Sequence, residues 1–161
     1  MVYYIFLDID GVLNDKNYII KAYKKNGGYA MNMSHVPFDP AALENLMKMV
    51  KIIRKHGEPR IILSSTWRLS DIDMAIAKAR LAEYGLQISD KTPYNHMNRG
   101  LEIRDFLSLR AIEYQMVILD DDSFDIIPIY PNNLVTVDRK IGLQWSDCKK
   151  ALEILNIIDF L

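Results

Sequence analysis

Four short, mainly apolar runs divide the chain, and each of them ends abruptly in polar residues. They cover residues 2–7, 60–63, 116–119 and 134–137. Continuous apolar runs of this length are typical of strands buried on both faces of a parallel sheet, whereas half-exposed strands alternate between apolar and polar residues. The runs therefore predict an α/β protein built on a parallel sheet.

The segments between the runs carry helix signals. Asp39 supplies an N-cap, Pro40 occupies the first helical position and Gly57 follows the last turn of one helix. Ser70 and Asp73 match a capping box for the next helix. Helices are expected over about residues 40–56, 71–84, 101–114 and 147–157, and an irregular segment is expected over residues 86–97.

Two carboxylates follow the first strand. Asp8 and Asp10 are two positions apart, so in extended backbone they face the same way, and Gly11 lets the chain turn away sharply. In open α/β sheets, ligands bind beyond the carboxyl ends of the strands. Carboxylates crowded this closely repel each other, and a hard divalent cation relieves the repulsion. The stretch predicts a site for Mg²⁺, although Asp and Gly are also ordinary turn residues.

The second and third apolar runs end in polar residues as well. Ser64, Ser65 and Arg68 follow the second run, and their hydroxyl and guanidinium groups are suitable donors to a phosphoryl oxygen. A helix-capping turn is the alternative interpretation of the same residues. Asp120 and Asp121 follow the third run, where adjacent like charges favour a cation or full exposure to solvent.

Residues 15–37 combine lysines with tyrosines around a pair of glycines. The glycine pair predicts a hairpin turn, so we expect a small flap beside the acidic site. Tyr23, Lys24 and Lys25 are its candidate contacts to a nucleobase and to phosphate. A solvated loop accounts for the pattern equally well.

The whole-chain composition narrows the class of protein. The length of 161 residues suits one domain, and 20 basic against 21 acidic residues leave a formal charge of −1. A nearly neutral chain has no overall attraction to nucleic acid or to a membrane, so a polyanionic partner would need a local basic patch. The single Cys148 fits a reducing compartment, and no apolar run approaches the roughly 20 residues of a membrane helix. We expect a cytoplasmic protein without a membrane partner.

Taken in chain order, a strand ending in DxDG, a strand ending in Ser, a basic residue at a helix start and a strand ending in an Asp pair resemble the haloacid dehalogenase (HAD) superfamily of phosphotransferases. The stretches FLDIDGVLN, ILSSTWR, RGLEIRDFL and VILDDD are similar, more narrowly, to the small HAD domains of Swiss Army Knife RNA-repair proteins and to polynucleotide 3′-phosphatases. The resemblance implies a Rossmann-like fold, with a parallel sheet flanked by helices on both faces. Because residues 15–37 are too few for a large cap, it also implies a minimal cap.

The resemblance further implies roles for the matching residues. Asp8 would be the nucleophile that becomes an aspartyl-phosphate, and Asp10 would be the general acid and then the general base. Mg²⁺ would be held by Asp8, by the backbone carbonyl of Asp10 and by an acid from the third strand end, Asp120 or Asp121.

Two further positions complete the implied set. Ser64 would donate a hydrogen bond to the phosphoryl group. The basic residue of the superfamily is usually Lys, and Arg99 looks like its replacement here, with Lys91 as a rival. Ser65 and Arg68 are additional candidate contacts to phosphate.

The implied function is a Mg²⁺-dependent phosphatase whose partner is a phosphorylated substrate, either a nucleic-acid 3′-phosphate end or a nucleotide. A phosphatase of small phosphate esters is an alternative within the enzymes. A phospho-receiver module or a non-catalytic phosphate-binding relative would be an alternative of another class. Receivers place an acidic pair on the first strand and a lone phospho-acceptor later, whereas here DxD comes first and the acidic run comes last.

Overall fold

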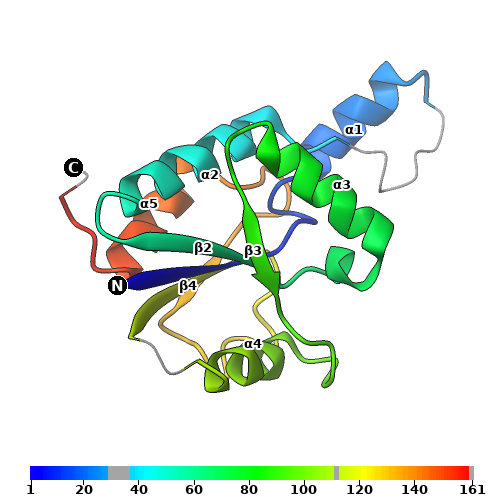
Figure 1. Cartoon of the computed structure of the whole chain (residues 1–161). Helices are drawn as coiled ribbons and strands as arrows, with labels where there is room; N and C mark the ends of the chain where they lie inside the picture. Colours follow the sequence, from blue (N-terminus) through cyan, green and yellow to red (C-terminus); the bar gives the residue numbers. More distant parts are fainter. Residues whose placement is uncertain (29–36, 111–112, 160–161) are drawn as a thin grey trace.

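The computed structural model describes residues 1–28, 37–110 and 113–159. In them, five parallel strands form one sheet in the order β3-β2-β1-β4-β5, and helices lie on both of its faces (Figure 1). This is the Rossmann-like α/β architecture that the sequence predicts. The elements are β1 (Val2–Leu7), α1 (Lys16–Lys25), α2 (Pro40–Ile53), β2 (Glu58–Leu63), the short 3-10 helix η2 (Thr66–Leu69), α3 (Asp71–Ala82), β3 (Ile88–Lys91), α4 (Arg99–Ser108), β4 (Tyr114–Asp120), β5 (Leu134–Thr136) and α5 (Trp145–Ile154).

The central strand β1 pairs with β2 and β4, and this pairing places the polar residues at one edge of the sheet. Its last residue, Leu7, pairs with Leu63 at the end of β2 and with Leu119 near the end of β4. Because the strands are parallel, their carboxyl ends reach the same edge. The residues that follow these pairs therefore lie side by side, and they are Asp8, Ser64 and Asp120.

Alternate strand residues pack against different layers of helices. Ile5 and Leu7 belong to a core cluster with buried residues of α2, α3 and α5. Tyr4 and Phe6 point to the opposite face, where both rings pack edge-on against Phe106 of α4, with centroids 5.7 Å and 5.6 Å away. The sheet thus has a thick helical layer on one face and α4 on the other.

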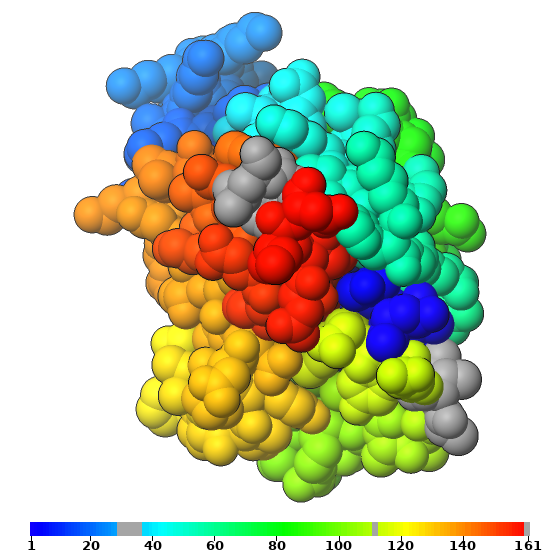
Figure 2. Space-filling view, turned by 90° about the vertical axis from the view of Figure 1, so that its left-hand side faces the viewer, coloured from blue at the N-terminus to red at the C-terminus, as the bar shows by residue number. Residues whose placement is uncertain are grey.

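Helix α1 contributes little to the core. Figure 2 shows it projecting from the top of the molecule, above the face formed by α2 and the C-terminal part of the chain. None of its residues is buried. At its start, Asp15 caps the helix by accepting from the N–H of Tyr18, and the N–H of Lys16 donates to the carbonyl of Arg139 at 2.8 Å. The helix is therefore joined to the body mainly at its N-terminus.

The predicted helix caps are present. The side chain of Asp39 accepts from the N–H of Ala41, with Pro40 at the first position of α2. Ser70 accepts from the N–H of Asp73 at the start of α3. The capping residues thus predicted the first residues of both helices, Pro40 and Asp71.

Two predicted elements were wrong. Residues 86–97 were expected to be irregular, but Ile88–Lys91 form β3, in which Ile88 is buried and the other three residues are exposed. The hairpin expected within residues 15–37 is instead helix α1, and the glycines at 27 and 28 take positive φ angles of 72° and 80° after its last turn. The rest of the expected flap, residues 29–36, lies outside the described residues.

Smaller differences concern helix limits. Helix α4 runs from Arg99 to Ser108 instead of from about residue 101 to 114, and Tyr114 belongs to β4. Helix α5 begins at Trp145, where Gln144 and Asp147 form a capping box. Across the part of the chain that is described, no helix combines the length and the apolar character needed to cross a membrane.

Candidate active site

The carboxyl edge of the sheet carries a row of polar side chains. The N–H of Asp8 donates to the carbonyl of Leu119, and the N–H of Ser64 donates to that of Leu7, both at 3.0 Å. These bonds continue the backbone hydrogen bonding between the parallel strands by one residue beyond β1 and β2. Side chains alternate between the two faces of a strand, and Phe6 and Ile118 lie on the face of the sheet that α4 covers. Asp8 and Asp120, two residues further on, are directed to the same face. The row therefore faces the N-terminus of α4.

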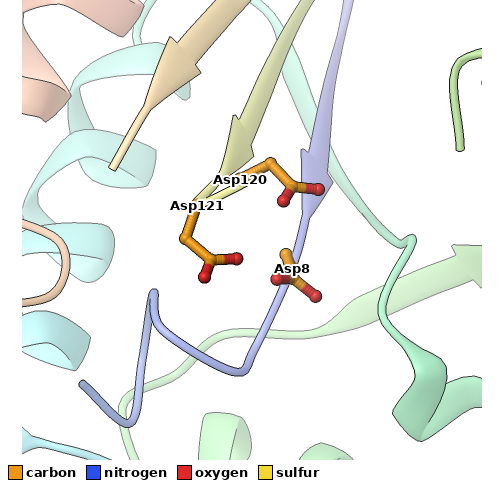
Figure 3. Close-up of side chains that lie close together, drawn as sticks. All are labelled: Asp8, Asp120 and Asp121. Carbon is orange, nitrogen blue, oxygen red and sulfur yellow. The ribbon is translucent and has the colours of Figure 1, made fainter. Parts of the chain in front are cut away.

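Three carboxylates from two strand ends converge there. Asp8, Asp120 and Asp121 each offer an oxygen within 4.8 Å of the others, and Figure 3 shows the three side chains turned toward one small space. Gly11, at φ 81°, permits this approach, since a Cβ there would lie 2.5 Å from Oδ2 of Asp121. Oxygen ligands at this spacing suit a hard divalent cation.

Burial makes a cation more favourable at this cluster. Asp8 is 4 % exposed and Asp120 is fully buried. Loss of solvent, followed by the charge of Asp120, raises the pKa of Asp8 well above its ordinary value. Loss of solvent likewise raises the pKa of Asp120 to about 6 and outweighs the opposing effect of Arg99. A bound cation would restore the ionised form of both groups, so the donor set fits Mg²⁺.

Arg99 places a positive charge beside Asp8 and Asp120. Its Nη1 lies 2.5 Å from Oδ2 of Asp120 and 3.6 Å from Oδ2 of Asp8. Burial opposes its charge, but Asp8 and Asp120 outweigh burial and raise the pKa of Arg99 above its usual value. The N–H of Arg99 donates to Oδ2 of Asp125 at 2.7 Å, which fixes the first turn of α4 beside the acids. Arg99 is therefore a permanent positive charge beside Asp8.

Lys91, the rival for this basic role, lies elsewhere. Its Nζ donates to the carbonyl of Arg68 at 3.4 Å, and its side chain lines a separate hollow beside α3. The cavity at the acidic cluster, about 420 Å³ in volume, is lined by Asp8, Asp10 and Arg99 among others, but Lys91 is not among its walls. The structure thus brings Arg99, and not Lys91, next to the carboxylates.

Asp10 lines the same cavity and is held through one oxygen. Its Oδ1 accepts from the indole N–H of Trp67 at 3.0 Å and from the amide of Asn14 at 2.8 Å. Asn14 in turn accepts the N–H of Gly11 through its own Oδ1. Asp10 is thereby fixed next to Asp8 by residues from two segments.

Ser64 and Ser65 have different surroundings. The Oγ of Ser64 is buried and has no hydrogen-bond partner within the described residues, and the same holds for Oγ1 of Thr92, beside it on the edge of the sheet. An unpaired buried hydroxyl is costly unless a ligand satisfies it. Ser65, in contrast, accepts the N–H of Trp67 at 3.3 Å, which caps η2 as the capping alternative predicts.

All the hydrogen-bond donors of the Arg68 guanidinium have partners in the protein. Its Nε and Nη atoms donate to the carbonyls of Ser64, Ser65, Thr92 and Pro93 and to the carboxylate of Glu102. These five contacts equal the five N–H donors of a guanidinium. Although Arg68 lines the cavity, direct contact with phosphate would require exchange of one of these bonds.

The candidate contacts on α1 do not reach this cavity. Lys25 lines a second groove, between α1 and the start of α2, and Tyr23 and Lys24 are exposed on the helix. The cavity at the acidic cluster is instead lined by two exposed residues from the segment before α4, Tyr94 and Met97. Met97 is 84 % exposed and has a φ of 50°, a conformation that non-glycine residues rarely adopt.

A comparison with family models decides the kind of domain. The model described as "HAD domain in Swiss Army Knife RNA repair proteins" matches residues 4–148. The chain belongs to this family. Searches of curated proteins and of solved structures gave no match. Membership, together with the acidic cluster at the edge of the sheet, supports a HAD-type phosphatase in general and a site compatible with a metal ion.

Four residues of this HAD domain have site contacts that sequence reasoning missed. Trp67 and Asn14 bind Asp10, Glu102 binds Arg68, and Nε of Arg139 lies 3.3 Å from Oδ2 of Asp121. Asn14, Trp67 and Glu102 all fall inside stretches that carry the family resemblance, so the resemblance was a usable signal for these three positions. Nothing in the local sequence, however, pairs Glu102 with Arg68.

Proposed function

We propose that this HAD domain is a Mg²⁺-dependent phosphatase that forms an aspartyl-phosphate on Asp8 and acts on nucleic-acid 3′-phosphate ends or nucleotides. The observation that supports it most is the placement of Asp8. Its carboxylate lies within 4.8 Å of those of Asp120 and Asp121, and the guanidinium of Arg99 is 3.6 Å away. A phosphoryl group held at Asp8 would meet a metal on one side and a fixed positive charge on the other.

The residues suited to hold Mg²⁺ are Asp8, Asp120 or Asp121, and the backbone carbonyl of Asp10. The ion would neutralise charge on the phosphoryl oxygens and keep the Asp8 carboxylate ionised despite its burial. The unpaired hydroxyl of Ser64 adjoins Asp8 on the sheet edge and would donate to a phosphoryl oxygen. Arg99 would contact another oxygen of the same group.

The reaction then has two displacements. A carboxylate oxygen of Asp8 attacks phosphorus while the bond to the leaving oxygen breaks, and Asp10 gives its proton to that oxygen. Water next attacks the phosphoryl group on Asp8, loses a proton to Asp10 and releases phosphate. Both carboxylates return to their starting states, so one phosphate ester and one water yield an alcohol and phosphate.

The family description is what favours nucleic-acid ends as substrates, since it refers to RNA-repair proteins. The geometry favours a second candidate, a small phosphate ester. The cavity is about 420 Å³, and the lysines of α1 do not line it. An oligonucleotide would therefore make any contacts to Lys24 and Lys25 outside the cavity.

The experiment is a side-by-side assay with Mg²⁺ of RNA and DNA ending in 3′-phosphate, the same oligonucleotides ending in 5′-phosphate, mononucleotides and a simple alkyl phosphate. We expect the highest kcat/KM for a 3′-phosphate end. For that substrate, the double change Lys24→Ser and Lys25→Ser should raise KM and weaken its salt dependence. Equal kcat/KM for mononucleotides and oligonucleotides would support the small-ester candidate, and no activity on any monoester would contradict the phosphatase.

A further inference from the structure

One oxygen of Asp10 accepts two hydrogen bonds from its neighbours, while the other has no hydrogen-bond partner among the residues that the structure describes. Oδ1 accepts two hydrogen bonds, from Trp67 Nε1 at 3.0 Å and from Asn14 Nδ2 at 2.8 Å. Within the described part of the chain, both side-chain hydrogen bonds to Asp10 end at Oδ1 and none reaches Oδ2, and Asp10 is one of the residues that line the cavity. The two oxygens of this carboxylate are therefore not equivalent.

Neither Trp67 nor Asn14 can accept a proton or a hydrogen bond from Asp10 in place of donating to it. An indole nitrogen only donates. The orientation of the Asn14 amide is fixed because its Oδ1 accepts the N–H of Gly11 at 3.1 Å, which leaves Nδ2 to face Asp10. A carboxylate oxygen with two such donors in place has no free lone pair to bind a proton.

The two donors are also held rigidly. Asn14 is fully buried and Trp67 is 4 % exposed. The indole packs edge-on against Phe38, with centroids 5.3 Å apart, and the guanidinium of Arg80 lies over the Phe38 ring at 4.7 Å. This packing limits rotation of the indole, so its N–H stays directed at Asp10.

We propose that Trp67 and Asn14 are positioning residues that reserve Oδ2 of Asp10 for proton transfer. The inference rests on the proposed function and adds the atom that carries the proton. As the bond between phosphorus and the leaving oxygen breaks and the bond to Asp8 forms, the proton on Oδ2 passes to the leaving oxygen. In the second displacement, Oδ2 takes a proton from the attacking water.

The test uses Trp67→Phe, which removes the indole N–H and keeps an aromatic ring in the packing. Trp145→Phe is the matched control, because Trp145 is the second of two tryptophans and lies at the start of α5, away from the cavity. The readout is kcat/KM, which covers only the steps through phosphoryl transfer to Asp8. An alkyl phosphate needs a proton on its leaving oxygen, whereas a nitrophenyl phosphate does not.

We expect Trp67→Phe to lower kcat/KM about 10-fold or more for the alkyl phosphate and less than about 3-fold for the nitrophenyl phosphate, a loss in the range of a hydrogen bond to a charged group. Trp145→Phe should change neither value. Equal losses on both substrates would show a structural role and overturn the inference, while wild-type protein inactive on both would contradict the proposed function itself.

A second measurement tests the contact without any substrate. With two tryptophans, the protein gives two indole N–H resonances, which the two Phe variants assign. We expect Asp10→Ala to shift the Trp67 resonance and speed its exchange with solvent, and to leave that of Trp145 in place. An unchanged Trp67 resonance would contradict the hydrogen bond from Trp67 to Asp10, whatever the activity of the enzyme.

Discussion

Arg68 and Glu102 form a buried ion pair, with Nη2 of the arginine 2.7 Å from Oε2 of the glutamate and both side chains only 3 % exposed. The pair joins η2, which follows β2, to the first turn of α4. Arg68 also binds the carbonyls that follow β2 and β3. The pair therefore holds the two segments that carry Ser64 and Arg99 at a fixed separation.

The first prediction concerns stability. Glu102→Ala leaves the guanidinium of Arg68 buried without its partner, and we expect the free energy of unfolding to fall by about 3–5 kcal/mol. Urea denaturation measures it. Glu58→Ala breaks an exposed pair with Arg60 and should hardly move the midpoint. A Glu102→Ala midpoint equal to that of the control would contradict the structural role of the buried pair.

The second prediction separates the two roles of Asp10. Asp10→Asn keeps a similar shape but has no proton to give, so kcat/KM should fall by about 10²-fold or more on an alkyl phosphate and much less on a nitrophenyl phosphate. The second displacement lacks its base with either substrate. Rapid mixing with nitrophenyl phosphate should therefore give a burst of one nitrophenol per enzyme, then slow turnover. Equal losses in kcat/KM without a burst would argue against the acid and base roles.

The third prediction compares the two candidates for the basic position. Arg99→Ala removes a desolvated charge next to Asp8 and should lower kcat by about 10²- to 10³-fold, as loss of a transition-state donor does. Lys91→Ala removes an exposed ammonium outside the cavity and should change kcat less than about 3-fold. If Lys91→Ala gave the larger loss, the basic role would move to that residue.

The fourth prediction is a pH dependence. Burial raises the pKa of Asp120 to about 6, and the pKa of Asp8 is raised too, first by burial and then by Asp120. Unfolded, both carboxyls titrate near about pH 4. Between about pH 4 and 6 the folded metal-free protein thus holds more protons than the unfolded chain, so the stability from these two groups is lost as pH rises through that window.

Mg²⁺ needs the ionised carboxylates, so its stabilising effect should have the opposite trend. We expect added Mg²⁺ to raise Tm little at pH 5 and clearly at pH 7, as measured by thermal unfolding at both pH values. Asp120→Asn should weaken the rise at pH 7. A shift of equal size at pH 5 and 7 would show that these carboxylates do not control metal binding.

The sequence predicted the acidic cluster because each part of it is local. A continuous apolar run buries a strand on both faces, and the carboxylate directly after it must then lie at the edge of the sheet, as Asp8 and Asp120 do. That β1 and β4 are neighbours, which brings these two ends together, was implied by the family resemblance and not by the apolar pattern. The two layers of helices were expected from the family resemblance, and the order of the strands was not predicted.

The sequence could not predict contacts that depend on distant packing. The indole of Trp67 reaches Asp10 across 57 positions, through the geometry of a four-residue 3-10 helix. Strand β3 was missed because Ile88 alone among its residues is buried, so it gives no apolar run. Helix α1 was missed because it buries no residue, and its glycine pair was read as a hairpin turn.

The most direct test of the central claim is to trap the phosphoryl group on Asp8. Asp10→Asn, which lacks the base for the second displacement, is mixed with Mg²⁺ and nitrophenyl phosphate, quenched in acid and digested for peptide mass spectrometry, with Asp8→Asn as the control. We expect one phosphoryl group on the peptide containing residues 2–16, located at Asp8 and absent from the control. Active enzyme that never carries phosphate at Asp8, or that carries it equally in Asp8→Asn, would contradict an aspartyl-phosphate on Asp8.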